Sequence, residues 1–496
     1  MLHEARRAGV LAHLTSLPGP VDHGDLGPPA LKFVDWLKRA GQTWWQMLPV
    51  VPPGYGGSPY GSPSTFAGSP ALVSLELLRS DGLLRRSELV PPLSGRQRAG
   101  IELRQTRLAL ACERLRAGHA PHLTRELERF RAEQASWLRD YCLYAALKRA
   151  HGGLSWVDWD EPIARRRAPA LERASRELTR EIDEHAMVQF FFQRQWSALR
   201  AHAHAAGVRL LGDMPMFVAH DGVDAWANPE QFFLRKDGRP SVVAGVPPDD
   251  FSETGQLWGN PLFRWEKMKQ NGFGWWLARL ARSLELFDAV RLDHFIGFHR
   301  YWEVPADAKT AMHGRFVLVP GRELLEATRA RFGGLPFLAE DLGVVTDDVV
   351  ALRRSFGLPG MKVLHFAFSD PNGSDYLPHR YDEHAVVYTG THDNDTTVGW
   401  FRGLPGGRDG ERARVLRYTA GSPKTIHFDL IRLAYASVAK LAIIPLQDVL
   451  GLDSRARMNT PGTSQGNWSW RAKPGQLTPP LAAELQQLAR TYERTP

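Results

Sequence analysis

The chain has 496 residues, of which 43% are hydrophobic and 23% are charged, a globular balance that excludes a disordered or fibrous protein. The net charge of +8 leaves a nucleic-acid partner open, whereas the 16 tryptophans suit either sugar rings or a packed core. No apolar run approaches the roughly 20 residues that span a bilayer, and the N-terminus lacks the apolar region of a secretory signal. With only two cysteines, Cys112 and Cys142, we expect a reduced, cytoplasmic protein without a membrane contact.

Short apolar runs recur along the chain, and each ends in polar or glycine-rich residues. Most, such as VRLLGDM, lack strict alternation, as parallel strands buried on both faces do. Helical patterns such as GWWLARLARSLELF separate them. This alternation predicts an α/β fold, a (β/α)8 TIM barrel that spans residues 1–496 as one catalytic domain. The expected strands are Gly9–Leu14, Thr43–Leu48, Val208–Asp213, Asp288–Asp293, Pro336–Asp341, Gly360–Ala367, Ala385–Gly390 and Leu441–Asp448.

Three longer segments interrupt the alternation. Residues 77–195, rich in Arg, Ala and Leu, predict a mostly helical insertion with ion pairs between interleaved Glu and Arg. A nucleic-acid surface is the alternative for this insertion, but no nucleic-acid motif is present and we expect no such partner. Residues 217–265 and 459–470 are rich in Gly, Pro and aromatic residues, and we expect loops that cover or shape a site. No separate C-terminal β-sandwich domain is expected.

Carboxylates stand at the ends of most expected strands, where (β/α)8 barrels carry their chemistry. Asp is also common in turns and at helix N-caps, which accounts for Asp448 and also fits Asp341 or Asp213. That interpretation explains a whole row of carboxylates poorly, because like charges in one cavity must be offset by function or by a cation such as Arg291. Glycoside chemistry uses one carboxylate at the anomeric carbon and a second to protonate the leaving oxygen.

The motifs GDMPMF, RLDHF, AEDLG and THDND resemble the four signature regions of the α-amylase clan. More narrowly, PYGSPSTFAGSP, AGVPPDDFSETGQLWGNP, GLPGMKVLHFAF and ARMNTPGTSQGNWSW resemble the amylomaltases, the 4-α-glucanotransferases or disproportionating enzymes of glycoside hydrolase family 77. The similarity runs from HLTSLPGP to GNWSW and so covers nearly the whole chain. Two signature regions lack the histidine and the Lys-His pair of α-amylases. Their absence favours transfer over hydrolysis and removes ligands of the amylase calcium ion.

The resemblance implies a role for each matching residue. Asp293 is the expected nucleophile and Glu340 the expected general acid/base. Asp393, directly after His392, is the expected third carboxylate, and Asp395 is its rival. Arg291, grouped with the substrate-binding residues, is expected to lie against Asp293 and keep it ionised. Other residues are expected to bind glucan: Tyr60, Asp213 and His392 at the donor sugar, Phe251, Gln256, Trp258, Asp370 and Asn459 on the acceptor side or in covering loops, and Tyr55 at a secondary glucan site. Simple packing is the alternative for the tryptophans and for Tyr55 in its turn.

These roles imply transfer of an α-1,4-glucan segment to the 4-hydroxyl of another glucan or of glucose, with retention, through a covalent glycosyl-enzyme. Maltooligosaccharides and amylose are the expected substrates, and no cofactor or metal is expected. The route requires the carboxyls of Asp293 and Glu340 to lie about 5–5.5 Å apart, and neighbouring carboxylates to raise the pKa of Glu340. The alternatives are a hydrolytic α-glucosidase or amylase with the same carboxylates, and a protein that only binds glucan or nucleic acid.

Overall fold

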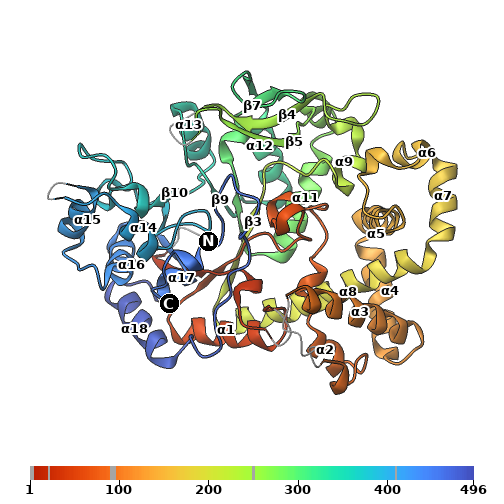
Figure 1. The fold of residues 1–496 in the computed structure, drawn as a ribbon, viewed down its shortest axis with the longest axis horizontal. Helices are drawn as coiled ribbons and strands as arrows, with labels where there is room; N and C mark the ends of the chain where they lie inside the picture. The colour runs from red at the N-terminus through yellow and green to blue at the C-terminus, as the bar shows by residue number, and fades with distance from the viewer. Residues whose placement is uncertain (1–4, 20–22, 90–96, 249–251, 408–409, 496) are drawn as a thin grey trace.

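The computed structural model describes residues 5–19, 23–89, 97–248, 252–407 and 410–495, which form a barrel with a helical arm on one side (Figure 1). Within this part of the chain, eight parallel strands pair in the order β10 (Gly360–Val363), β11 (Ala385–Tyr388), β12 (Leu441–Pro445), β1 (Arg7–Leu11), β2 (Trp44–Gln46), β3 (Arg209–Met214), β6 (Ala289–Leu292) and β9 (Phe337–Ala339). The Ala339 N–H in β9 donates to the carbonyl of Pro359, next to β10, over 3.0 Å, so the first and last strands of this order meet. The predicted (β/α)8 barrel is confirmed.

Two apolar layers hold the barrel together. Alternate strand residues point inward, where Leu211, Met361 and Ile443 pack in one cluster, and the others pack against the surrounding helices. Gly9 on β1 faces inward next to Trp44. A Cβ at Gly9 would lie 2.6 Å from the Trp44 Cβ, so the close approach of these two strands requires glycine.

Each strand overlaps a predicted run, and all but β3, which ends one residue later, end sooner than predicted. After β10 the chain turns at once into a 3-10 helix, Leu364–Phe366, and after β12 into the short helix α17 (Leu446–Val449). The apolar character continues past the strand ends because these turns are also buried, so hydrophobicity alone does not mark where pairing stops.

Helix α1 (Pro28–Arg39) shows how the outer helices follow from the sequence. It begins with a proline in the first turn, where the missing N–H has no helical partner, and it ends with basic residues, which suit the helix dipole. Its buried stripe is Ala30, Phe33, Val34 and Leu37, the spacing of one helix face. The other helices around the barrel are α8 (Thr179–Ala205), α11 (Gly274–Leu286), α12 (Gly321–Phe332), α13 (Asp347–Ser355), α14 (Thr397–Gly403), α15 (Glu411–Thr419), α16 (Ile426–Ala436) and α18 (Pro479–Thr491).

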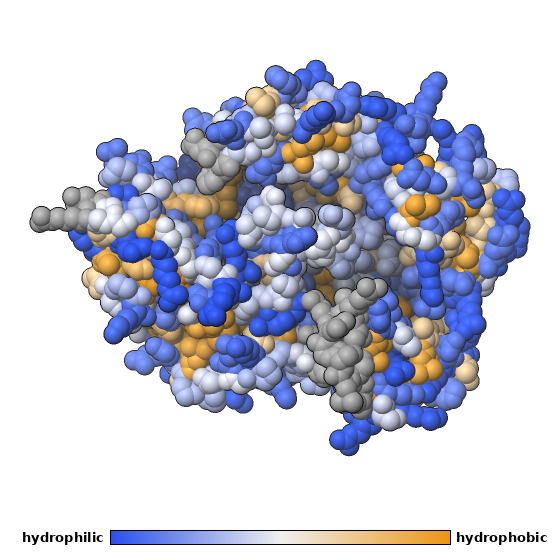
Figure 2. All heavy atoms as spheres, viewed as in Figure 1, coloured by the Kyte–Doolittle hydropathy of each residue, from blue (hydrophilic) through white to orange (hydrophobic). Residues whose placement is uncertain are grey.

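The chain between β2 and β3 forms the helical arm, coloured orange to yellow in Figure 1. Its ion pairs include Arg165–Glu161 at 2.9 Å, four residues apart along the chain, and Arg114–Glu88 at 2.7 Å between segments. Hydrophilic residues cover much of the arm in Figure 2, so its charges lie on a solvated surface. The helices of the arm, before α8, are α2 (Leu75–Ser80), α3 (Gln97–Arg116), α4 (Pro121–Glu133), α5 (Ala135–Ala150), α6 (Glu161–Ala164) and α7 (Ala168–Glu177).

An antiparallel sheet that the sequence analysis did not predict lies beside the barrel, near β7 and β4 in Figure 1. Its strands follow the order β5 (Gln256–Pro261), β4 (Val242–Val246), β7 (Arg300–Pro305) and β8 (Arg315–Leu318). β4, β5 and the short helix α9 (Val223–Ala227) come from the segment 217–265 that was expected to be loop-rich, and the short helix α10 (Trp265–Gln270) begins at its last residue. A small cluster of Val243, Val304 and Ala311 packs on the sheet. Most residues of the edge strand β5 are exposed, so they lack the apolar alternation that predicts a strand.

The two ends of the chain meet at the base of the barrel. The buried Arg494 guanidinium donates to backbone carbonyls that include those of Arg7, Tyr435 and Ser437. From the end of β12 to Thr495 the described residues contain helices and turns but no strand. Among the helices that the structure describes, none is long and apolar enough to cross a membrane, and both cysteines are buried and free.

Candidate active site

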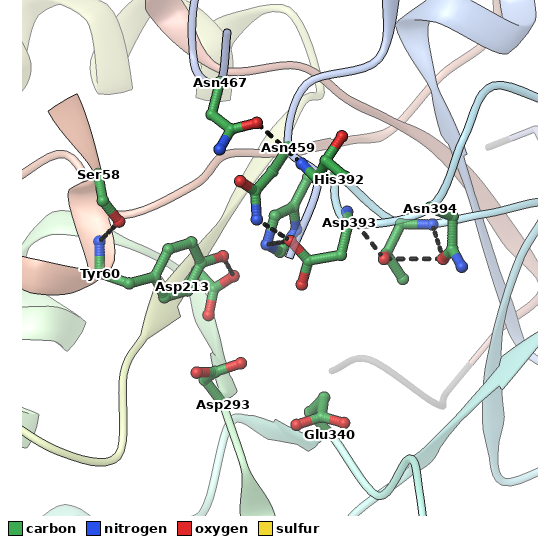
Figure 3. Close-up of polar contacts among 12 residues, drawn as sticks. Ser58, Tyr60, Asp213, Asp293, Glu340, His392, Asp393, Asn394, Asn459 and Asn467 are labelled. Carbon is green, nitrogen blue, oxygen red and sulfur yellow. Dashed lines mark hydrogen bonds and ion pairs between the residues drawn. The ribbon is translucent and has the colours of Figure 1, made fainter. Parts of the chain in front are cut away.

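Two of the expected catalytic carboxylates lie directly at strand ends. Asp293 follows the last residue of β6, and its N–H donates to the carbonyl of Met214 over 3.0 Å. Glu340 follows the last residue of β9, and its N–H donates to the carbonyl of Leu292 over 3.0 Å. The barrel's hydrogen bonding therefore extends to both residues and fixes their backbones. Their side chains face the same open space (Figure 3).

Arg291 joins three carboxylates. Its Nη1 lies 2.8 Å from Asp293 Oδ1 and 2.9 Å from both oxygens of Asp213, and its Nη2 lies 4.0 Å from Glu340 Oε2. Burial by itself lowers the pKa of Arg291, but Asp213 and Asp293 hold the pKa above its ordinary value. A permanent cation thus offsets the repulsion that the clustered carboxylates would otherwise suffer.

Glu340 holds its proton near neutral pH. Its pKa is raised to about 8: burial is the largest cause, and the charge of Asp293 also raises the pKa, while Arg291 opposes both. The N–H groups of His294, at 2.7 Å, and Leu342, at 3.1 Å, also favour the ionised form. The raised pKa was expected from neighbouring carboxylates. The structure gives burial the larger part.

Tyr60 and Asp213 form one wall of the site. The Tyr60 hydroxyl donates to Asp213 Oδ2 over 2.8 Å, and the Asp213 side chain has no exposed surface. The Tyr60 ring stacks on His392, with centroids 5.1 Å apart, and lies 5.8 Å from the ring of Trp468. In this structure the Asp213 oxygens therefore hold Arg291 and Tyr60 in place. A bond from Asp213 to a sugar hydroxyl stays a prediction.

Asp393 lies across the open space, in the loop that follows β11 (Figure 3). Asn459 Nδ2 donates to its Oδ1 over 2.6 Å, and Arg457 donates to its backbone carbonyl. The rival Asp395 instead accepts hydrogen bonds from Ser454 Oγ at 2.6 Å and from the N–H of Thr396. Because these bonds engage Asp395, Asp393 is the candidate for the third carboxylate.

Asp448 has a structural role, as interpreted from the sequence, but its bonds reach beyond its own turn to the loop after β11 and the first residue of α14. Its buried carboxylate accepts hydrogen bonds from Thr389 Oγ1 at 2.5 Å and from the N–H and Oγ1 of Thr397 at 2.7 and 2.8 Å. The two threonines stand at opposite ends of the loop that carries His392 and Asp393. Asp448 therefore ties both ends of that loop together. In the sequence, Thr389 and Thr397 on either side of the THDND segment were the available sign that a buried acceptor holds this loop.

Asp341 has a structural role at the neighbouring strand end. It pairs with Arg353 Nε at 2.9 Å and accepts the N–H of Met361 at 2.7 Å. These contacts link the chain after β9 to β10 at the position where the barrel closes. This agrees with the structural interpretation that the sequence left open for Asp341.

The segments expected on the acceptor side lie around the carboxylates. Trp258, on β5, is 37% exposed and donates through Nε1 to Gln256 Oε1 over 3.1 Å. Its ring meets the edge of His294, with centroids 4.8 Å apart. The loop 459–470 brings Trp468 against Tyr60 and His392. His294 and Arg457 were not among the residues expected at the site, although His294 directly follows the expected nucleophile.

Three expected binding residues are less closely tied to the site. Phe251 lies outside the described residues. Asp370 Oδ1 accepts the N–H of Asn372 over 2.8 Å in a turn between β10 and β11. Tyr55 is 91% exposed, which suits a surface contact but not packing within its turn. Their binding roles stay predictions.

The carboxylate cluster matches the needs of retaining glycoside chemistry: a carboxylate paired with arginine, a second that keeps its proton, and a third beside them. Within the described residues, no group of three or more His, Cys, Asp or Glu side chains is placed to hold a metal ion.

Comparison with known proteins agrees with this geometry. The 4-alpha-glucanotransferase family of glycoside hydrolases matches residues 12–478. The 4-alpha-glucanotransferase of Thermus thermophilus is 48% identical over 99% of both chains, and the chloroplastic/amyloplastic enzyme of Solanum tuberosum is 45% identical over 99% of this chain and 87% of that one. The structure of amylomaltase from Streptococcus agalactiae in complex with acarbose superposes with a TM-score of 0.95, at 36% identity, over 99% of this chain and 100% of that one. These relatives support transfer over the hydrolytic alternative. The chain belongs to the 4-alpha-glucanotransferase family and is a glucan-transferring enzyme.

Proposed function

We propose that this enzyme transfers segments of α-1,4-glucans between maltooligosaccharides or amylose by double displacement, with Asp293, Glu340 and Asp393 as its catalytic residues. The observation that carries the proposal is the cluster around Arg291, which pairs with Asp293 beside a Glu340 that keeps its proton to about pH 8. One carboxylate is thus equipped to attack, and the other to act as an acid.

In the first step Asp293 attacks C1 of the donor glucan, and the C1–O bond to the leaving glucan breaks. Glu340 gives its proton to the departing oxygen, and the leaving glucan becomes an alcohol. The carboxylate of Asp293 becomes an ester of the donor sugar. In the second step the ionised Glu340 takes the proton of an acceptor 4-hydroxyl, which attacks C1 and releases Asp293. Two inversions retain the α configuration.

Asp393 and its neighbours bind the donor sugar in this proposal. The side chain of Asp393 is 43% exposed and Asn459 holds one of its oxygens, so the other oxygen is free to accept sugar hydroxyls as charge develops at C1. The Tyr60 ring, fixed by Asp213 and His392, gives that sugar an apolar face.

Transfer requires an acceptor sugar to compete with water. We assign this selection to Trp258 and Gln256 on β5 and to the loop 459–470, which present aromatic and polar groups beside the carboxylates. An oriented hydroxyl reacts faster than a free one, and covering loops exclude solvent. Glucose is the smallest acceptor expected.

Incubation with maltotriose tests the proposed reaction. Transfer produces glucose together with maltodextrins longer than the substrate, whereas hydrolysis produces only glucose and maltose. Trp258→Ala is expected to shift the products towards hydrolysis. An unchanged ratio of transfer to hydrolysis in that variant contradicts the role of β5 in selecting the acceptor.

A trapping experiment tests the covalent step. In Glu340→Gln, α-glucosyl fluoride still reacts, since fluoride leaves without an acid, but no base remains to activate an acceptor. The variant is expected to accumulate one glucosyl unit on the peptide that contains Asp293, detected by mass spectrometry. Glu340→Gln combined with Asp293→Asn is the matched control and should stay unlabelled. Label on any other residue overturns the assignment of Asp293.

A further inference from the structure

His294 has an unusual backbone beside the catalytic carboxylates. Its φ is 51°, in the left-handed region that residues other than glycine rarely adopt. In this conformation its N–H donates to Glu340 Oε2 over 2.7 Å. A backbone held in an unfavourable region at an active site indicates that the surrounding contacts, and the bond it makes there, are strong enough to keep it so.

The His294 side chain points to a different partner. It is partly buried, and its desolvation lowers the pKa of the imidazole to about 4, so the ring is neutral near pH 7. The ring lies edge-on to Trp258, with centroids 4.8 Å apart at 81°, and 6.2 Å from Phe217. One residue therefore contacts the exposed acceptor-side strand through its ring and the acid/base through its amide.

We propose that His294 is a positioning residue that couples Trp258 to Glu340. This inference rests on the proposed function, in which Trp258 binds the acceptor and Glu340 deprotonates it. When an acceptor sugar holds Trp258 in place, the ring of His294 is held as well, and its N–H stays directed at Glu340 Oε2. Because the N–H favours the ionised carboxylate, the base needed for the second step is stabilised when an acceptor is present.

The left-handed backbone makes the two contacts of His294 separable. His294→Asn and His294→Gly both tolerate the left-handed region, so they keep the N–H in place but remove the ring. His294→Ala removes the ring and favours a backbone that turns the N–H away from Glu340. The Asn and Gly variants thus report on Trp258, and the Ala variant reports on both contacts.

Products from maltotriose give the first measurement. We expect His294→Asn and His294→Gly to lower the ratio of transfer to hydrolysis about as much as Trp258→Ala does. Once Trp258 is already Ala, His294→Asn should lower the ratio no further, since the two rings act as one unit. Independent, additive losses in the double variant overturn the coupling.

The pH profile gives the second measurement. The charged and titratable groups around Glu340 are Arg291, Asp293, Asp341, His294 and Tyr376, and none of the others changes in these variants. Loss of the N–H bond is expected to move the basic limb of kcat/KM to higher pH in His294→Ala, and kcat to fall about tenfold. In His294→Asn the limb stays where it is in the unmodified enzyme. A shift common to both variants, or to neither, overturns the role of the amide.

Release of fluoride separates this inference from the proposed function. The first burst from α-glucosyl fluoride needs Asp293 but no acid, so it should be preserved in all His294 variants. A burst lost in His294→Asn and His294→Gly indicates a general structural role and overturns the proposal. If the unmodified enzyme shows no burst and no transfer, it is the proposed function that fails. Should His294→Ala not fold, the Asn and Gly variants with the double variant still decide the coupling.

Discussion

The two sides of the active site are held in different ways. Asp293 and Glu340 directly follow β6 and β9, and backbone hydrogen bonds of the barrel fix both residues. Asp393 lies in a loop beyond β11 and depends on side chains from elsewhere, including Asn459 and Asp448. The proposed reacting pair is therefore placed by the strands of the barrel, whereas the proposed third carboxylate is placed by a network of side chains.

The two sides of the site also differ in how deeply their carboxylates are buried. The side chain of Glu340 is 13% exposed and that of Asp393 is 43% exposed. Burial raises the pKa of Glu340, which proton transfer requires, while access to the sugar is what Asp393 requires. Rigid strand ends thus suit the groups that exchange protons and bonds. A loop suits a group such as Asp393, which has to remain accessible to the sugar.

The largest expected effect on activity comes from the carboxylates at the strand ends. Asp293→Asn removes the nucleophile, and we expect kcat for maltotriose transfer to fall by about 10⁴-fold or more. Asp393→Asn keeps both reacting groups and should lose less, because it weakens transition-state binding only. Initial rates of glucose release measure both. A larger loss in Asp393→Asn than in Asp293→Asn contradicts the division between the two sides.

Asn459→Ala removes a bond that holds the loop residue Asp393 and leaves Asp293 and Glu340 unchanged. Its amide holds Asp393 Oδ1 at 2.6 Å, so we expect Asp393 to move and kcat to fall by about 100-fold. The same initial-rate assay measures the loss. Thr463→Ala, in the same loop but bonded to Thr460 and Asn467, is the matched control and should stay within a few-fold of the unmodified enzyme. Equal losses in both variants would show that the whole loop matters, not its bond to Asp393.

Asp448→Asn weakens the two ends of the loop that carries Asp393. In Asp448, Oδ2 accepts both threonine hydroxyls and Oδ1 accepts the Thr397 N–H. Asn has only one acceptor oxygen and cannot satisfy both groups, so we expect kcat to fall about tenfold and the free energy of unfolding by about 1–3 kcal/mol. Asp288→Asn is the control. Asp288 also accepts a backbone N–H, that of Leu210 at 2.8 Å, but it lies at the opposite end of the barrel. Its loss should lower stability and leave kcat unchanged.

This difference also explains what the sequence could predict. Asp293 and Glu340 end runs whose apolar pattern marks a buried strand, so the barrel and the place of both carboxylates at its strand ends follow from local sequence, whereas their proposed roles rest on the family resemblance. The bonds of Asp448 and Asn459 join residues far apart in the chain, and no local pattern encodes them. The small sheet was missed for a related reason. The exposed edge strand β5 has no apolar alternation, and pairing with β4 determines its structure.

The smallest expected effect is on stability, and its sign depends on pH. The pKa of Glu340 is about 8 in the folded enzyme and about 4.3 in an unfolded chain, so between these values the folded state binds more protons. Stability from this group is therefore complete below about pH 4.3 and is lost as the pH rises to about 8. Glu340→Gln does not titrate, so its Tm should exceed that of the unmodified enzyme by an amount that grows across this window, to about 2–4 °C, and then stays constant.

Asp393→Asn provides the contrast with Glu340→Gln. The half-exposed Asp393 carboxylate keeps contact with water, so neutralising it relieves little burial cost, and the lost bond to Asn459 should lower Tm instead. Thermal unfolding of the three proteins between pH 5 and 9 measures both changes. A Tm gain in Asp393→Asn as large as that in Glu340→Gln would show that the third carboxylate is strained by burial in the same way. The carboxylate at the strand end and the carboxylate in the loop would then differ in how they are held but not in the free-energy cost of burying their charge.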